Sequence, residues 1–247
     1  MKNFAGIDKG FYSVGIDGCR DGWITAVIHK GELSLHKSVC FRETMDQRPF
    51  DACLVDMVIG LQGNEKQIRP DGMARKILKK RAPTVFSAPC RKAVYGETKE
   101  ARLRANEQVL HKRFSRQTDA IIPKIREVDE FLQSASQYKN KIQESHPEVC
   151  FARLNGDVLL SGKHSMEGIK VRVAVIADYL PEFTVNRVME AAKQMRCKPD
   201  DITDAVCLAI AANMLAQGRA ETIPPEPMMD DTGLLMQMVI PKVVKKG

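Results

Sequence analysis

The sequence predicts a mixed α/β fold built on a five-stranded sheet, in which three antiparallel strands are followed by parallel strands and helices flank the sheet. Three observations predict this class. Residues 13–41 contain three apolar, strand-like runs joined by short polar turns. A fourth apolar run of strand length follows at 52–61, and mostly helical sequence comes after it. A strand meander that feeds further strands through helices is typical of a mixed sheet.

The strands are expected in this order. The runs SVGIDG (13–18), GWITAVIHK (22–30) and LSLHKSVCF (33–41) form the meander, and KGEL (30–33) supplies a tight turn between the second and the third. ACLVDMVIGL (52–61) is apolar throughout and predicts a fourth strand buried on both faces. KIQESHPEVCF (141–151) is expected to be extended, because Pro147 interrupts any helix there. It supplies the fifth strand.

Helices are expected between and after these strands. The candidates are DGMARKILKKR (71–81), a charged stretch at 97–118, PKIREVDEFLQSA (123–135), HSMEGIKVRVAVIADYL (164–180), TVNRVMEAAKQM (184–195) and KPDDITDAVCLAIAANMLAQG (198–218). Pro123 is expected to begin the third, since proline suits the first turn of a helix. The last has clear boundaries, with Pro199 at its start and Gly218 at its C-terminal cap. An edge strand is expected after Gly233.

The whole chain, 1–247, is expected to form one domain that carries a basic, mostly helical insertion at 62–122. Residues 64–116 contain fifteen Lys and Arg against five Asp and Glu, in a protein whose net charge is +7. A basic block on a nearly neutral body indicates a polyanionic partner, and nucleic acid is the first candidate. A solvated, charge-rich helical face is the alternative.

Composition narrows the protein class. The seven cysteines are scattered and contain no CxxC pair, so they are expected to be buried and reduced. No apolar run approaches the roughly 20 residues of a membrane span, and MKNFAGIDKGFYS at the N-terminus lacks the apolar core of a signal peptide. A cytoplasmic protein without a membrane partner is therefore expected. No GxxxxGK[ST] phosphate loop occurs.

Four aspartates stand in an unusual context. Asp17 ends the first expected strand and Asp56 lies in the fourth, while Asp201 and Asp204 are three residues apart at the start of the last helix. That spacing places the last two on one helical face. Clustered carboxylates repel one another unless a cation lies among them. Because Mg²⁺ and Mn²⁺ prefer oxygen ligands, the four residues predict a site for either metal.

The motifs in which these residues lie allow a family resemblance to be stated. The stretches are GIDGCRDGW (15–23), VDMVIGL (55–61), RPDGMARKIL (69–78), TVFSAP (84–89), PKIREVD (123–129), ESHPEVCF (144–151) and DDITDA (200–205). Together the chain resembles a bacterial and archaeal domain-of-unknown-function family of predicted nucleases with an RNase H-like fold. More distantly, DDITDA and the residues after it resemble the last-helix motif of bacterial Holliday-junction resolvases.

The resemblance implies roles for individual residues. It implies that Asp17, Asp56, Asp201 and Asp204 bind metal and are catalytic. Glu144 is favoured over Glu148 as a further catalytic carboxylate. The alternative role for Glu148 is an ion pair with a nearby arginine. Five basic residues lie in or near the motifs and are expected to grip substrate phosphates: Arg20, Arg75, Arg81, Lys163 and Arg172. Neutralising nearby carboxylates is the alternative for Arg20 and Arg75.

The function expected from these features is metal-dependent hydrolysis of nucleic-acid phosphodiester bonds by a two-metal carboxylate mechanism. Two other functions stay open. An actin-like or sugar-kinase-like phosphotransferase of the same superfamily would also use an aspartate on the first strand. A catalytically silent nucleic-acid-binding protein would keep the fold without the chemistry. A homodimer is compatible with each of these functions.

Overall fold

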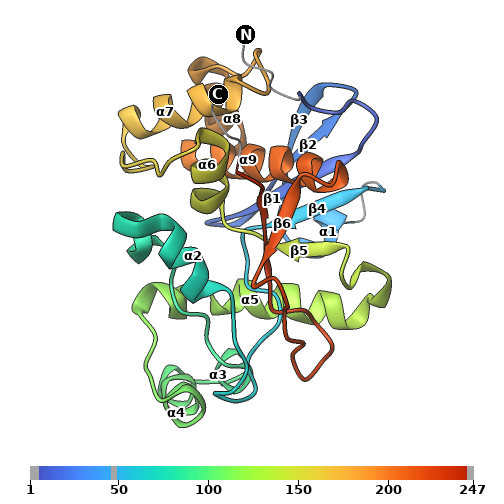
Figure 1. Cartoon of the computed structure of the whole chain (residues 1–247). Helices are drawn as coiled ribbons and strands as arrows, with labels where there is room; N and C mark the ends of the chain where they lie inside the picture. The colour runs from blue at the N-terminus through green and yellow to red at the C-terminus, as the bar shows by residue number, and fades with distance from the viewer. Residues whose placement is uncertain (1–5, 46–48, 244–247) are drawn as a thin grey trace. The chain divides into compact units, whose positions relative to one another are not determined.

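The computed structural model describes residues 6–45 and 49–243, and both ends of the expected domain 1–247 lie outside that description. The chain divides into two compact units. The first unit comprises Met1–Asp56, Ser145–Glu221 and Val239–Gly247, and the second comprises Met57–Glu144 and Thr222–Met238. The expected basic insertion, 62–122, lies wholly inside the second unit. The elements are labelled in Figure 1.

The central sheet confirms the predicted mixed α/β class. Its strands are β1 (Ser13–Cys19), β2 (Gly22–His29), β3 (Glu32–Ser38), β4 (Ala52–Val55) and β5 (Ile142–Glu144), in the order β3-β2-β1-β4-β5. β1, β2 and β3 pair antiparallel, and β1 pairs parallel with β4. Lys30 and Gly31 both have positive φ between β2 and β3, as two-residue hairpin turns require. The predicted turn at 30–33 is therefore confirmed.

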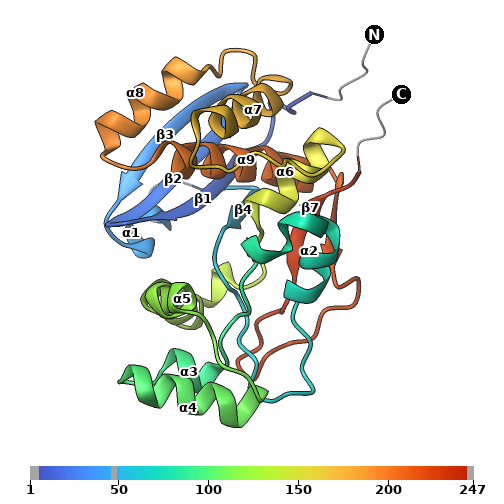
Figure 2. The same cartoon turned by 90° about the vertical axis from the view of Figure 1, so that its left-hand side faces the viewer.

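The helices of the first unit are α1 (Phe41–Met45), α6 (Pro147–Asn155), α7 (Met166–Ala177), α8 (Val185–Met195) and α9 (Pro199–Ala216). α9 packs against β1, β2 and β4 on one side and is also in contact with α6, α7 and α8. Figure 2 shows α9 running alongside the strands. Because α9 lies between two layers, nearly all of its side chains are buried, which explains the continuous apolar run after Asp204.

The second unit is mostly helical. It contains α2 (Asp71–Leu78), α3 (Arg91–Val94), α4 (Lys99–Leu110), α5 (Arg116–Ser134) and the 3₁₀ turns Lys79–Thr84 and Ser136–Tyr138. β6 (Ala220–Ile223) and β7 (Met238–Pro241) form a separate two-stranded sheet. Among the helices of the described residues, none combines the length and apolarity needed to cross a bilayer.

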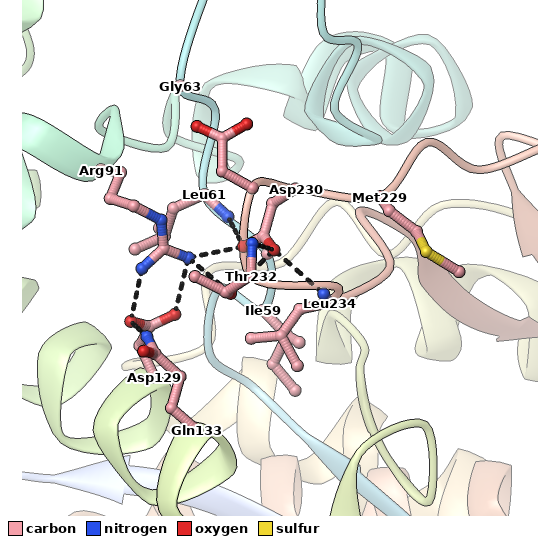
Figure 3. Close-up of polar contacts among 12 residues, drawn as sticks. Ile59, Leu61, Gly63, Arg91, Asp129, Gln133, Met229, Asp230, Thr232 and Leu234 are labelled. Atoms are coloured by element: carbon pink, nitrogen blue, oxygen red, sulfur yellow. Dashed lines mark hydrogen bonds and ion pairs between the residues drawn. The ribbon is translucent and has the colours of Figure 1, made fainter. Parts of the chain in front are cut away.

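A buried ion-pair network ties the second unit together (Figure 3). Arg91 of α3 donates to the two carboxylate oxygens of Asp129 on α5 at 2.8 and 3.1 Å, and to Asp230 at 2.6 Å. Asp230 also accepts hydrogen bonds from the backbone N–H groups of Leu61 and Leu234, both at 2.9 Å. One guanidinium therefore links α3, α5 and the segment around Asp230, and these contacts are structural.

Several predicted elements were wrong in extent. The third strand, expected over 33–41, ends at Ser38, and Phe41 begins α1. The fourth strand ends at Val55, before Asp56, because the N–H groups of Ile59 and Leu61 bond to carboxylates of the second unit instead of a strand. The expected extended run 141–151 becomes helix from Pro147, which begins α6 as its first residue. The stretch 97–118 is not one helix, since α4 ends at Leu110.

The helix expected to begin at Pro123 starts earlier, at Arg116. The hydroxyl oxygen of Ser115 accepts a hydrogen bond from the N–H of Thr118 at 3.1 Å, which is a typical N-terminal cap. Pro123 therefore lies inside α5. The serine cap, eight residues before the proline, therefore sets the start of this helix.

Candidate metal site

Asp17 and Asp56 follow matched positions on two adjacent parallel strands. In the register of β1 and β4, Ile16 lies opposite Val55, so the next residue along each strand is an aspartate. The N–H of Asp56 donates to the carbonyl of Ile16 at 2.9 Å, which extends the pairing by one step. Adjacent strands are about 4.8 Å apart. The register therefore places the two carboxylates side by side in the first unit.

Helix α9 supplies the other two aspartates to the same face of β1. A Cβ atom on Gly15 would lie 2.2 Å from the carbonyl oxygen of Ala205, so strand and helix backbones touch at this point. Asp17 is two residues beyond Gly15 and shares its face of the strand. Asp204 directly precedes Ala205, and Asp201 lies one turn before it. Close packing at a glycine thus brings Asp17 toward the start of α9.

Burial makes this group of carboxylates electrostatically costly. Asp17 is 6% exposed and Asp204 is fully buried. Burial raises the pKa of Asp17 well above its usual value, and the negative charges of Asp56 and Asp204 raise it further. Burial also raises the pKa of Asp201, and it raises that of Asp204 to about 6 despite a nearby lysine. The group therefore favours protons or cations.

The ammonium group of Lys163 contacts this cluster. Its Nζ lies 2.6 Å from Oδ2 of Asp204 and 3.8 Å from Oδ2 of Asp200. Burial alone would lower the pKa of Lys163, but the charges of Asp204, Asp17 and Asp56 raise it well above its usual value. The ammonium group is therefore charged at neutral pH and partly offsets the carboxylates.

The remaining oxygen of Asp204 decides whether the site suits a metal ion. Oδ1 of Asp204 is buried and has no hydrogen-bond partner within the described residues. Among all residues that the structure describes, no three His, Cys, Asp or Glu side chains lie close enough together to enclose an ion. Mg²⁺ commonly takes one or two protein carboxylates and completes its shell with water and substrate phosphate. A Mg²⁺ or Mn²⁺ ion held here would therefore take most of its ligands from water.

Asp201 has a second task at the helix start. Its Oδ2 accepts a hydrogen bond from the N–H of Lys198 at 2.9 Å. A carboxylate in this position stabilises the first turn of a helix, where N–H groups lack partners. Asp201 thus fixes the start of α9, on which Asp204 is carried.

The two glutamates considered for the site are both engaged in ion pairs. Glu144 belongs to the second unit, where its oxygens accept from Arg69 at 2.6 and 2.7 Å and from the N–H of Ile59 at 2.7 Å. Burial raises the pKa of Glu144 to about 7, although Arg69 opposes the shift. Glu148 pairs with Arg172 inside the first unit. Its alternative role as an ion-pair partner is confirmed, and we place neither glutamate among the metal ligands.

The basic residues predicted to bind substrate have different surroundings. Arg172 is fully buried and donates to Glu148 and to the carbonyl oxygens of Ser161 and Gly168. Arg75 donates to the carbonyl of Val85 and the hydroxyl of Ser87, both at 2.9 Å. These two side chains hold the fold. Arg20 is exposed on the turn after β1, and Arg81 is half-buried at the end of the Lys79–Thr84 turn.

Comparison with protein families bears on the identity of the chain. The family model described as "Protein of unknown function (DUF429)" matches residues 15–229, which is most of the sequence. The chain belongs to this family. No curated protein and no solved structure matches it. The DUF429 match begins two residues before Asp17 and includes Asp56, Lys163, Asp201 and Asp204. The whole candidate site is therefore part of the family region.

Sequence reasoning missed the direct contact of the 162–165 segment with the start of α9. His164 Nδ1 lies 3.1 Å from Oδ2 of Asp200, next to the Lys163 contact. The sequence signal available was the adjacent Lys-His pair, 37 residues before an Asp-Asp pair. That signal is weak, because nothing in the local pattern shows that the loop before α7 reaches α9.

Proposed function

We propose that this DUF429 chain is a divalent-metal-dependent nuclease that hydrolyses phosphodiester bonds of nucleic acids. The observation that carries the proposal is the group of Asp17, Asp56, Asp201 and Asp204. All of these except Asp56 are buried, and one oxygen of Asp204 has no hydrogen-bond partner among the described residues. Lys163 offsets only part of this negative charge, and burying the rest without a further cation is costly. A site built this way is expected to take its missing positive charge from a ligand.

The order of the elements supports an RNase H-like assignment. The sheet order β3-β2-β1-β4-β5, with a helix packed on β1, matches the arrangement that the sequence resemblance implies. So does the distribution of the carboxylates over β1, the end of β4 and the last helix. The assignment thus rests on both the topology and the position of the acidic residues.

The residues have distinct tasks in this proposal. Bound Mg²⁺ or Mn²⁺ supplies an activated water and stabilises the leaving oxygen of a phosphodiester. Asp204 and Asp17 would hold the ion, because they are the most buried of the four carboxylates. Asp56 adds negative charge from the adjacent strand, while Asp201 fixes the first turn of α9.

The surface of the second unit favours nucleic acid as the substrate. Within 64–116, ten Lys and Arg side chains are exposed against four exposed Glu side chains. The exposed basic residues are Lys66, Lys76, Lys79, Lys80, Lys92, Lys99, Arg104, Lys112, Arg113 and Arg116. Exposed cations attract the phosphate backbone without reading its sequence. We therefore expect strong binding at low salt with little sequence preference.

A cleavage assay tests the proposal. The full chain is incubated with four-way junction, duplex, single-stranded DNA and RNA, in Mg²⁺ or Mn²⁺. Cleavage is expected with at least one substrate, and it is expected to disappear in Asp17→Asn and Asp204→Asn. Asp21→Asn is the matched control, because Asp21 is exposed on the turn that follows β1 and pairs with Lys37.

The two alternative functions give different results in the same assay. Binding that weakens with salt, without cleavage of any substrate, would identify a silent nucleic-acid-binding protein. ATP consumption that depends on a sugar acceptor would identify a phosphotransferase. Either result would overturn the nuclease proposal.

A further inference from the structure

The loop that joins α6 and α7 projects Lys163 onto the acidic cluster. The Lys163 side chain is about one-third exposed, whereas that of Asp204 is fully buried, and 2.6 Å separates Nζ from Oδ2. The ammonium group also lies 3.8 Å from Asp200. This contact joins two segments of the first unit that are 41 residues apart.

Hydrogen bonds on both sides of Lys163 hold its loop in place. Ser165 caps α7 by accepting a hydrogen bond from the N–H of Gly168 at 3.0 Å, and its hydroxyl donates to the carbonyl of Gly162 at 2.8 Å. Two residues before Lys163, the carbonyl of Ser161 accepts from Arg172 at 3.2 Å. The loop is anchored at both 161 and 165, so the position of the ammonium group is built into the fold.

The contact divides the two oxygens of Asp204. Oδ2 is bound by Lys163, while Oδ1 is buried and has no hydrogen-bond partner among the described residues. In a two-metal site the ions are about 4 Å apart, and a carboxylate between them offers one oxygen to each. A metal ion at Oδ2 would lie about 2 Å from that oxygen and would be strongly repelled by the ammonium group there.

We propose that Lys163 takes the place of a second metal ion, so that the site binds one divalent ion at the Oδ1 side of Asp204. This inference rests on the proposed function and specifies its metal content. It agrees with the small number of carboxylates available, since no three ligand side chains of the described residues surround one point. Lys163 thereby acts as a fixed counter-ion rather than as a residue that grips substrate.

The test is the number of Mn²⁺ ions bound per chain, measured by electron paramagnetic resonance of free Mn²⁺ during titration of the full protein. The wild type is expected to bind one ion that Asp204→Asn removes. Lys163→Met is expected to bind two, because Oδ2 becomes available. Lys170→Met removes one exposed positive charge from α7 and is expected to keep one ion. Lys163→Gln serves as a second variant if Lys163→Met does not fold.

The outcomes separate this inference from the proposed function. Two ions on the wild type, or one ion on both Lys163 variants, would overturn the inference and leave a metal site in place. Binding of two Mn²⁺ ions by Lys170→Met would show that the loss of any positive charge admits a second ion. That result would also overturn the inference. No saturable binding to the wild type or to the Lys163 variants would overturn the metal site itself.

Discussion

Asp204 is expected to make the stability of the first unit depend on pH. Burial, opposed by Lys163, raises its pKa from the usual 3.8 to about 6 in the folded protein. The folded state therefore holds this proton more tightly than the unfolded chain does. Its contribution to stability is fully present below about pH 3.8 and is lost as the pH rises through about 6.

The size of the effect follows from the two pKa values. The difference between 3.8 and about 6 corresponds to about 3 kcal/mol, at about 1.4 kcal/mol for each pH unit. Asp204→Asn cannot titrate. The free energy of unfolding of Asp204→Asn, minus that of the wild type, is thus expected to grow by about 2.5 kcal/mol between pH 4 and 7. Because Asp204 also raises the pKa of Asp17, removing it adds to the change in the same direction.

Urea unfolding followed by the fluorescence of Trp23 measures this difference. Trp23 is the single tryptophan, is fully buried in β2 and belongs to the first unit. The experiment is run in chelator at several pH values, since a bound metal ion would mask the titration. Asp21→Asn is the control, because Asp21 is exposed and its pKa is lowered by Lys37, so its stability difference stays flat above pH 4. A flat difference for Asp204→Asn as well would refute the argument from burial.

Three substitutions test the packing and the buried charges. Arg172→Met is expected to destabilise the first unit by about 3–5 kcal/mol, because Glu148 loses its partner in a buried pair. The double variant with Glu148→Gln should recover part of this loss. Gly15→Ala is expected to cost about 3 kcal/mol or more, since its Cβ would overlap α9 backbone, whereas Gly162→Ala has open space. Tryptophan fluorescence during urea unfolding reports both. Asp230→Asn is expected to increase hydrogen exchange around the Arg91 network at least tenfold, because hydrogen bonds that lower the pKa of Asp230 against burial are weakened.

Each of these expectations has an outcome that contradicts it. Arg172→Met with wild-type stability but weaker nucleic-acid binding would restore the substrate-binding role predicted from the sequence. Equal stability of Gly15→Ala and Gly162→Ala would show that β1 and α9 do not pack as closely as described. Unchanged exchange in Asp230→Asn would remove the structural role of the network.

Much of the first unit could be predicted because its sequence signals are local. The three antiparallel strands have short turns, and the β2–β3 turn follows from Lys30-Gly31, which adopts the positive φ that such a hairpin needs. The boundaries of α9 follow from two residues. Pro199 begins the helix, and Gly218, which has positive φ, stands two residues after its last residue, Ala216. The end of the fourth strand was predicted wrongly. The apolar residues after Val55 are buried in a loop, and the N–H groups of this loop bond to carboxylates far away in the sequence.

The candidate site could be predicted only in part for the same reason. Asp17, Asp56 and Asp204 stand out locally, since each is a carboxylate in or beside an apolar run. The partners of the charged residues are long-range contacts that local pattern does not encode. Lys163 meets Asp204 across 41 residues, and Arg69 meets Glu144 across 75. Local pattern therefore pointed to the aspartates, but it could not show that Arg75 and Arg172 donate hydrogen bonds within the fold.

The most direct test of the metal site is a crystal of the full chain soaked in Mn²⁺ and measured at a wavelength where manganese scatters anomalously. One anomalous peak is expected in the first unit, about 2 Å from Oδ1 of Asp204 and beside Asp17, with Lys163 still bound to Oδ2. An empty map among Asp17, Asp56, Asp201 and Asp204 at saturating Mn²⁺ would contradict the claim that these carboxylates form a metal site.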